Sequence, residues 1–323
     1  MVLDNMTEIK TDETARLAEA RRNIEAVVRG KSEVVELALI ALLAGGHLLL
    51  EDTPGVGKTL LALSLAQSIQ SSFRRIQLTN DTLPADIIGT QVYSRSREKM
   101  EFITGPLFAG VVLADEINRT SPKTQSALLE AMAEHHVTVE NEVYELPEPF
   151  MVIATQNPLE QQGTFPLPEN QLDRFLFRTS IGYPSRSAEL EILEREIDTT
   201  STVNIKPLIT LDYLRSLRAE VASVVFDPAL LEYIIDIVEA TRRDERLLMG
   251  ASPRGALMLK KAARAAALIR GRRYVIPDDI KDMSVPVLSH RLVARGGSGA
   301  YASERRQSET LLRSILDRIE VPL

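Results

Sequence analysis

The chain has 323 residues, a formal net charge of −7 at pH 7 and a pI near 5.4. The length allows two domains with a substantial core, and the absence of cysteine excludes disulfides, thiol catalysis and cysteine-ligated zinc. A nucleic-acid-binding protein usually has a basic field, which this acidic balance disfavours. The N-terminus is polar and acidic, unlike a signal peptide, and the longest nearly apolar run (residues 37–50) is too short to span a bilayer. We therefore expect a cytoplasmic protein without a membrane span.

The first half of the chain alternates between helical and strand-like segments, which is typical of an α/β fold with a parallel sheet. Apolar residues at helical spacing predict helices over about residues 7–28, 31–46, 58–69 and 122–136. Short apolar runs predict five buried strands, at residues 47–52, 74–79, 110–117, 150–158 and 177–184. Two further segments, residues 89–108 and 137–147, alternate polar and apolar side chains around a charged turn. Each of these is expected to form a β-hairpin inserted into the core.

After Pro184 the strong patterns are helical, so we place a domain boundary there. The expected domains are an α/β core over residues 1–184 and a smaller all-helical domain over residues 185–323. The helical patterns cover residues 185–197, 227–245, 253–271 and 308–319, and residues 294–306 predict a flexible link. Residues 260–273 carry six basic residues and no acidic one. We interpret this stretch as a solvated helix face, balanced by the acidic residues of PDDIKD at 277–282.

A phosphate-binding loop is indicated by EDTPGVGKT at residues 51–59. Gly57, Lys58 and Thr59 satisfy the end of the G-x-x-x-x-G-K-[ST] pattern, but Asp52 stands where the first glycine is usual. Asp52 is tolerable because a short polar side chain can make the strand-exit turn by bonding its own backbone. The loop follows an apolar strand and opens a helix, as a phosphate site requires. The residues expected to bind nucleotide are Thr53, Pro54, Gly55, Val56, Gly57, Lys58, Thr59 and Leu60.

Further polar residues follow two other predicted strands. Asp115 and Glu116 end an apolar run, and two carboxylates at a strand tip are costly unless they serve a site. In P-loop ATPases such an aspartate, together with Thr59 of the loop, holds magnesium, and the adjacent glutamate polarises water as general base. Asn157 ends the next predicted strand, where an amide can orient the water or touch the γ-phosphate. A helix-capping role for the carboxylates and a plain turn before Pro158 are the alternatives.

Together these residues resemble the AAA+ ATPases, and within them the MoxR family. The resemblance covers nearly the whole chain and rests on EDTPGVGKT (51–59), ADEINRTSPKTQSALLEAM (114–132), ATQNPLEQQGTFPLPENQLDRF (154–175) and SPRGALML (252–259). It implies a P-loop AAA+ core with a five-stranded parallel sheet and hairpin inserts, a helical lid domain, and ATP/ADP and Mg²⁺ as cofactors. MoxR-like proteins often carry an acidic residue where Asp52 stands. The implied roles are Walker A for Lys58 and Thr59, Walker B for Asp115 and Glu116, sensor 1 for Asn157, arginine finger for Arg174 and sensor 2 for Arg254.

The arginines also have local interpretations. Arg174 could pair with Asp173 or Glu169 on its own surface. Arg254 opens a predicted helix, where a positive charge is unfavourable against the helix dipole unless an anion such as phosphate offsets it. Arg119, just after the Walker B pair, is a second candidate for a charge that reaches a neighbouring site.

The resemblance implies a function as well as a fold. An arginine finger acts in trans, so we expect a head-to-tail homo-oligomeric ring, hexameric as in most AAA+ relatives. Nucleotide is expected between core and lid, in contact with Arg254, so that hydrolysis changes the lid angle. The expected output is chaperone-like remodelling or maturation of a protein client, with a partner that carries a von Willebrand factor A domain. Alternatives are a magnesium-chelatase ATPase subunit, a DNA-acting motor, which the acidic balance disfavours, and a nucleotide-gated scaffold, which Glu116 and Asn157 disfavour.

Overall fold

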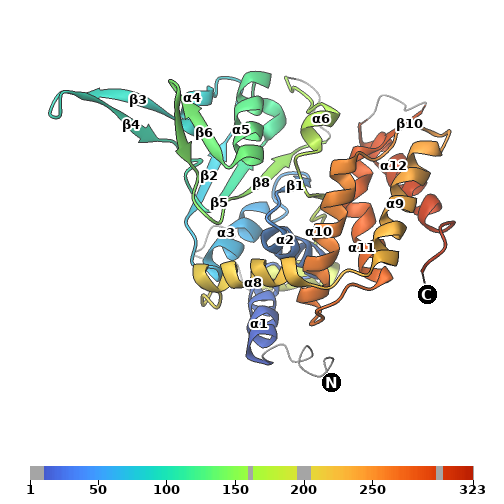
Figure 1. The fold of residues 1–323 in the computed structure, drawn as a ribbon. Coiled ribbons are helices and arrows are strands. Elements are labelled where there is room, and N and C mark those ends of the chain that lie inside the picture. The colour runs from blue at the N-terminus through green and yellow to red at the C-terminus, as the bar shows by residue number, and fades with distance from the viewer. Residues whose placement is uncertain (1–10, 159–162, 195–204, 296–300, 323) are drawn as a thin grey trace.

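The computed structural model describes residues 11–158, 163–194, 205–295 and 301–322. In Figure 1 these residues form an α/β core, with a sheet between helical layers, and a group of helices packed beside it. The sheet has five strands in the order β2-β5-β8-β1-β9, and every pairing is parallel. The strands are β1 (Leu48–Glu51), β2 (Phe73–Gln77), β5 (Val111–Asp115), β8 (Met151–Gln156) and β9 (Phe177–Thr179). The predicted five-stranded parallel sheet is therefore confirmed.

The sheet separates two apolar cores, because successive side chains of a strand point to opposite faces. Leu48 and Leu50 belong to one core and Leu49 to the other. The first core includes residues of α1 (Thr11–Val27), α2 (Ser32–Ala44) and α3 (Lys58–Ser68), and the second includes residues of α4 (Pro84–Ile88) and α5 (Pro122–Glu134). Residues 7–10 of the first predicted helix lie outside the described residues.

Both predicted hairpins are present. One pairs β3 (Gly89–Ser94) with β4 (Lys99–Thr104), and the other pairs β6 (His136–Val139) with β7 (Glu142–Glu145). Figure 1 shows the β3–β4 hairpin projecting away from the core. The ring of Phe102 stacks on that of Tyr144 with 3.9 Å between centroids, which joins the two hairpins, whereas Ile103 is 57% exposed.

The lid is helical as expected, with one addition. Its helices are α7 (Arg186–Glu194), α8 (Leu211–Ser223), α9 (Pro228–Arg243), α10 (Pro253–Ile269), α11 (Pro277–Leu288), the short η2 (Ser289–Arg291) and α12 (Tyr301–Leu316). The addition is a two-stranded antiparallel sheet of β10 (Leu247–Met249) and β11 (Val293–Ala294). Helix α12 starts at Tyr301, so the predicted link is shorter than 294–306. Its residues 296–300, like residues 195–197 of the predicted helix 185–197, lie outside the described residues.

Core and lid share one continuous apolar interior. Helix α2 packs against lid helices α8 and α10, and their buried side chains form a single cluster with those of the sheet face. We propose the domain boundary near residue 184 because the type of secondary structure changes there. The apolar packing nevertheless continues across this boundary.

The end of the basic stretch 260–273, just after α10, is balanced by acids of α11, as expected. Arg270 Nη1 lies 3.0 Å from Asp279 Oδ1 and 2.8 Å from Asp282 Oδ2, and Arg272 Nη1 lies 2.6 Å from Asp279 Oδ2. Asp279 is fully buried, so these bonds supply the compensation that a buried carboxylate needs.

Candidate active site

The carboxyl edge of the sheet gathers the predicted Walker and sensor 1 residues. The phosphate-binding loop follows β1, Asp115 ends β5, and Asn157 follows β8, which lies between β5 and β1. Register places Glu51 opposite Gln156 and Gln77 opposite Asp115, so these strands end at one edge. Three segments that are distant in sequence are thereby brought to one place, where ligands of open α/β sheets usually bind.

The loop over residues 53–57 has the geometry of a phosphate cradle. Gly55 and Gly57 have φ of +86° and +96°, and no heavy atom lies within 4 Å of a Cβ added to either, so the space before the loop is open. Helix α3 starts at Lys58 and presents the positive end of its dipole to that space. Lys58 Nζ donates to Asp52 O at 3.0 Å and lies beside the loop. These residues fit a bound phosphate group.

The carboxylate of Asp52 does not bond its own backbone, contrary to our expectation. It accepts hydrogen bonds from Ile181 N at 2.6 Å and Gly182 N at 2.9 Å, just beyond β9. Strand β9 is the neighbour of β1, and its exiting chain presents two N–H groups that require acceptors in a buried place. Asp52, 6% exposed, supplies both acceptors and ties the phosphate-binding loop to the exit of β9.

Thr155 organises both Walker B residues and was missed by the sequence analysis. Its fully buried Oγ1 donates to Asp115 Oδ1 at 2.5 Å and accepts from Glu116 N at 2.9 Å. Glu116 has φ +59°, a left-handed conformation that non-glycine residues adopt at a small energetic cost. The only signal in the sequence is a polar residue two positions before Asn157, inside an otherwise apolar strand.

Strand β2 contributes two polar side chains that were also missed. Arg75 Nη2 lies 2.6 Å from Asp115 Oδ2, and Gln77 Nε2 donates to Glu116 Oε2 at 3.1 Å. Arg119 Nε lies 3.1 Å from the same Glu116 oxygen. Arg119, proposed as a charge that reaches a neighbour, thus pairs with its own chain's Glu116 here. The signal in the sequence is that polar residues stand on both sides of the apolar Ile76.

Arg174 lies at the opposite, amino edge of the sheet. It follows the short helix α6 (Glu169–Leu172) and precedes β9, and Leu176 N donates to His47 O at the start of β1. The guanidinium donates from Nη1 to Leu129 O in α5 at 2.6 Å. The alternative partner Asp173 is instead held by Arg291 of the lid at 2.7 Å.

Arg254 lies beside Asp173, not beside the phosphate-binding loop of the same chain. Its Nε is 3.8 Å from Asp173 Oδ2, at the amino edge. The expectation that Arg254 touches the nucleotide of its own chain is not supported by this geometry, because Arg254, in the first turn of α10, contacts the segment before β9. The carboxylate of Asp173 supplies negative charge to the helix start, as a phosphate was expected to do.

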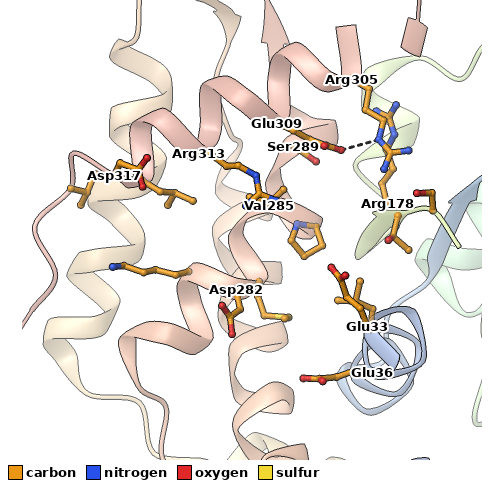
Figure 2. A pocket seen from close by; sticks show the side chains of 18 of the residues that line it. Glu33, Glu36, Arg178, Asp282, Val285, Ser289, Arg305, Glu309, Arg313 and Asp317 are labelled. Carbon is orange, nitrogen blue, oxygen red and sulfur yellow. Dashed lines mark hydrogen bonds and ion pairs between the residues drawn. The ribbon is translucent and has the colours of Figure 1, made fainter. Parts of the chain in front are cut away.

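A cavity of about 1050 Å³ lies between core and lid. Figure 2 shows its lining side chains, which come from α2, β9, α11 and α12. None of the described Walker residues lines it. Arg178 and Arg305 of its wall both pair with the buried Glu51, at 2.8 Å and 3.0 Å, and Glu51 directly precedes Asp52. Helix α12 is thereby joined to the strand that carries the phosphate-binding loop.

The part of the chain that the structure describes holds no cluster of three or more histidine or carboxylate side chains able to bind a metal. Thr59 and Asp115 are the residues that could hold magnesium, with phosphate oxygens and water as its other ligands, as is usual for this ion. Among the described residues, no helix is both long and apolar enough to cross a membrane.

Comparison with known proteins identifies the family. Residues 47–177 match the model described as "ATPase family associated with various cellular activities (AAA)", and residues 239–315 match the AAA lid domain. The chaperone MoxR1 of Mycobacterium tuberculosis is 42% identical over 319 residues, which cover 96% of this chain and 83% of MoxR1. The chain belongs to the MoxR family of AAA+ ATPases. The uncharacterized protein YeaC of Bacillus subtilis is 46% identical over 307 residues, 95% of each chain.

A solved structure has the same fold as this chain. The crystal structure of an inferred ATPase from Cytophaga hutchinsonii superposes with a TM-score of 0.87 at 36% identity and covers 96% of both chains. Magnesium-chelatase subunits are more distant: ChlI-1 of Arabidopsis thaliana is 28% identical over 194 residues, 57% of this chain and 43% of its own.

Proposed function

We propose that this MoxR-family protein hydrolyses ATP at the subunit interfaces of a homo-oligomeric ring, hexameric as in most AAA+ relatives. The single observation that carries the proposal is the position of Arg174. The Walker residues lie at the carboxyl edge of the sheet and Arg174 lies at the amino edge, so one chain cannot bring them together. A head-to-tail contact places the amino edge of one subunit against the carboxyl edge of the next, and a ring closes such contacts.

Each polar group of the carboxyl edge has a place in this reaction. Backbone N–H groups of residues 55–58 and the Lys58 ammonium bind the β- and γ-phosphates. Thr59 and Asp115 would hold Mg²⁺, which neutralises phosphate charge when bound. Glu116 takes a proton from the attacking water, whose oxygen bonds to the γ-phosphorus as the bond to the leaving oxygen of ADP breaks. Asn157 orients that water, and Arg174 of the neighbouring subunit stabilises the charge of the transition state.

The output that fits best is chaperone-like work on a protein client in the cytoplasm. The support is similarity over nearly the full chain to a protein named as a chaperone. A partner with a von Willebrand factor A domain belongs to the same proposal and follows from the family resemblance alone. Capture on Glu116→Gln rings with ATP would identify both.

Mixing two inactive variants tests the ring. Lys58→Ala subunits lose ATP binding because the charge facing the phosphates is gone, but they keep Arg174. Arg174→Ala subunits keep ATP binding and lose hydrolysis, by about 10³–10⁵-fold if the finger is worth what it is in GTPases. A mixture should regain activity, because an intact Arg174 can then face an intact loop. Subunit exchange is verified first with fluorescent labels. Exchange without recovered activity at any ratio rejects the in-trans role.

A further inference from the structure

Arg291 of the lid contacts the core on both sides of Arg174. It ends η2, and its side chain is 1% exposed. Its Nε donates to Asp173 Oδ1 at 2.7 Å, while its Nη2 donates to Phe175 O at 2.6 Å and to Asp173 O at 3.1 Å. Asp173 and Phe175 are the two chain neighbours of Arg174. The lid thus holds the backbone and a side chain of the segment that carries the proposed finger.

A guanidinium suits this place and an ammonium does not. Burial lowers the pKa of Arg291 to about 10, so the side chain is still charged at neutral pH, and Asp173 supplies the opposite charge. The planar fork reaches one carboxylate and two carbonyl oxygens together. Lysine presents a single point of charge on a flexible stem and cannot reproduce that geometry.

Close packing in the lid fixes the fork itself. Gly255, in the first turn of α10, has no side chain, and a Cβ added there would stand 3.1 Å from Arg291 Cδ and 3.3 Å from Leu288 Cδ2. Arg291 Nη1 also donates to Val287 O in the last turn of α11. The start of α10, η2 and the segment 173–175 therefore form one packed unit.

The same unit includes the second arginine of the amino edge. Asp173 offers Oδ1 to Arg291, and its Oδ2 lies 3.8 Å from the Nε of Arg254, which is about half exposed. A carboxylate fixed from inside by a buried arginine can hold an exposed arginine in one orientation. Arg291 therefore holds the chain on both sides of Arg174, and its partner Asp173 also contacts Arg254.

We propose that Arg291 is a positioning residue that fixes Arg174, and through Asp173 also Arg254, for the active site of the next subunit. The inference rests on the proposed function, since it needs a finger that acts in trans. It has a mechanical consequence. Because Arg291 belongs to the lid, a change of lid angle in one subunit moves the arginines that this subunit offers to its neighbour, so the two sites are coupled.

The test measures only the ATPase activity that a subunit restores to its neighbour by supplying Arg174. Subunits that carry both Lys58→Ala and Arg291→Lys cannot bind ATP, so in a mixture with Arg174→Ala subunits they contribute nothing but their amino edge. We expect them to restore about 10²-fold less activity than Lys58→Ala subunits do, the loss that a misplacement of about 1 Å causes. The matched control is Lys58→Ala with Arg295→Lys, because Arg295 donates to Leu247 O within the lid, away from Arg174. This control should restore full activity.

The outcomes separate the two proposals. If Lys58→Ala subunits restore the same ATPase activity with and without Arg291→Lys, the positioning role is overturned and the proposed function stands. No restoration by Lys58→Ala subunits, although labels show exchange, rejects the proposed function and the positioning role with it. In the opposite arrangement, Arg291→Lys subunits with an intact loop should bind a fluorescent ATP analogue normally and hydrolyse ATP when Lys58→Ala subunits supply the finger. Weak binding that no partner rescues would indicate a merely structural role.

A second variant covers the case in which Arg291→Lys does not fold. Gly255→Ala keeps every charge and displaces the Arg291 side chain from the lid side. In the Lys58→Ala background it should lower the activity donated to Arg174→Ala subunits in the same direction. A folded Gly255→Ala subunit that donates normally would overturn the positioning role.

Discussion

Arg75 Nη2 lies 2.6 Å from Asp115 Oδ2, so the carboxylate proposed to hold magnesium is paired with a cation on the neighbouring strand. Thr155 holds the other oxygen of Asp115 at 2.5 Å. A magnesium ion that binds at this carboxylate must therefore share or replace the Arg75 contact, and the two cations compete.

This competition predicts that Arg75→Gln binds Mg·ATP at lower free magnesium. The Arg75 side chain is about half exposed, so the pair is worth little and the half-saturating magnesium concentration should fall only about two- to fivefold. Titrating magnesium at fixed fluorescent ATP analogue measures it. Arg74→Gln is the control, since the neighbouring residue on β2 points to the other face. A higher magnesium requirement in Arg75→Gln would show that Arg75 instead positions Asp115.

Asp52→Gly restores the usual first letter of the loop but should destabilise the protein. The carboxylate accepts a buried N–H group from Ile181 and a partly buried one from Gly182, and glycine leaves both without an acceptor. Losing such partners typically costs about 1–3 kcal/mol for each buried group. Asp52→Asn should fall between, because its amide can accept one N–H while its NH₂ faces the other.

Denaturant unfolding of the two Asp52 variants checks this, with Asp212→Asn as control because the side chain of Asp212 is 93% exposed. An unchanged midpoint for Asp52→Gly would mean that the contact with the exit of β9 contributes nothing to stability.

The carboxyl edge could be predicted from the sequence because its pattern is local. A strand, a glycine-rich turn and a helix are consecutive in the chain, and the sheet order then follows from few choices. The roles proposed for Lys58, Asp115 and Glu116 depend only on the pattern of their own segments. The contacts of Thr155 and Arg75 could not be predicted, because the partner of a polar residue inside a strand is known only once the neighbouring strand is known.

The contacts between core and lid could not be predicted. Arg291 and Asp173 are 118 positions apart, and the sequence around one residue does not indicate the other as its partner. The dipole argument for Arg254 correctly required an anion at the start of α10, but it could not decide between a phosphate and the carboxylate of Asp173. Only the packing of α10 against α2 determines which one lies there.

Glu116→Gln should bind Mg·ATP normally and hydrolyse it about 10²–10⁴-fold more slowly, the usual cost of losing a general base. Glutamine keeps the shape and can still meet Arg119 through its amide oxygen, but it cannot take the proton of water. Phosphate release under saturating ATP measures the rate. Glu142→Gln, the same change on the exposed strand β7, should leave turnover unaltered. Turnover near normal in Glu116→Gln would place the base elsewhere.

The surroundings of His47 predict that the folded protein loses stability in acid. Its Nε2 lies 2.9 Å from Met132 O and its Nδ1 accepts from Val152 N at 3.0 Å, so the neutral ring with its proton on Nε2 satisfies both partners. A second proton would have to sit on Nδ1, against the N–H of Val152. Burial, chiefly, lowers the pKa of His47 from 6.5 to about 4.

The sign follows from which state binds the proton. Between about pH 6.5 and pH 4, His47 binds a proton in the unfolded chain but stays neutral in the folded protein. The contribution of His47 to the free energy of unfolding is therefore complete above pH 6.5 and is lost as the pH falls toward 4. From pH 7 to pH 5 the loss from this one ring should be about 2 kcal/mol in the free energy of unfolding. His47→Gln, whose amide can still donate and accept, should start less stable at pH 7 and lose about that much less on acidification. Parallel pH profiles for wild type and His47→Gln would show that His47 does not hold its pKa low in the folded protein.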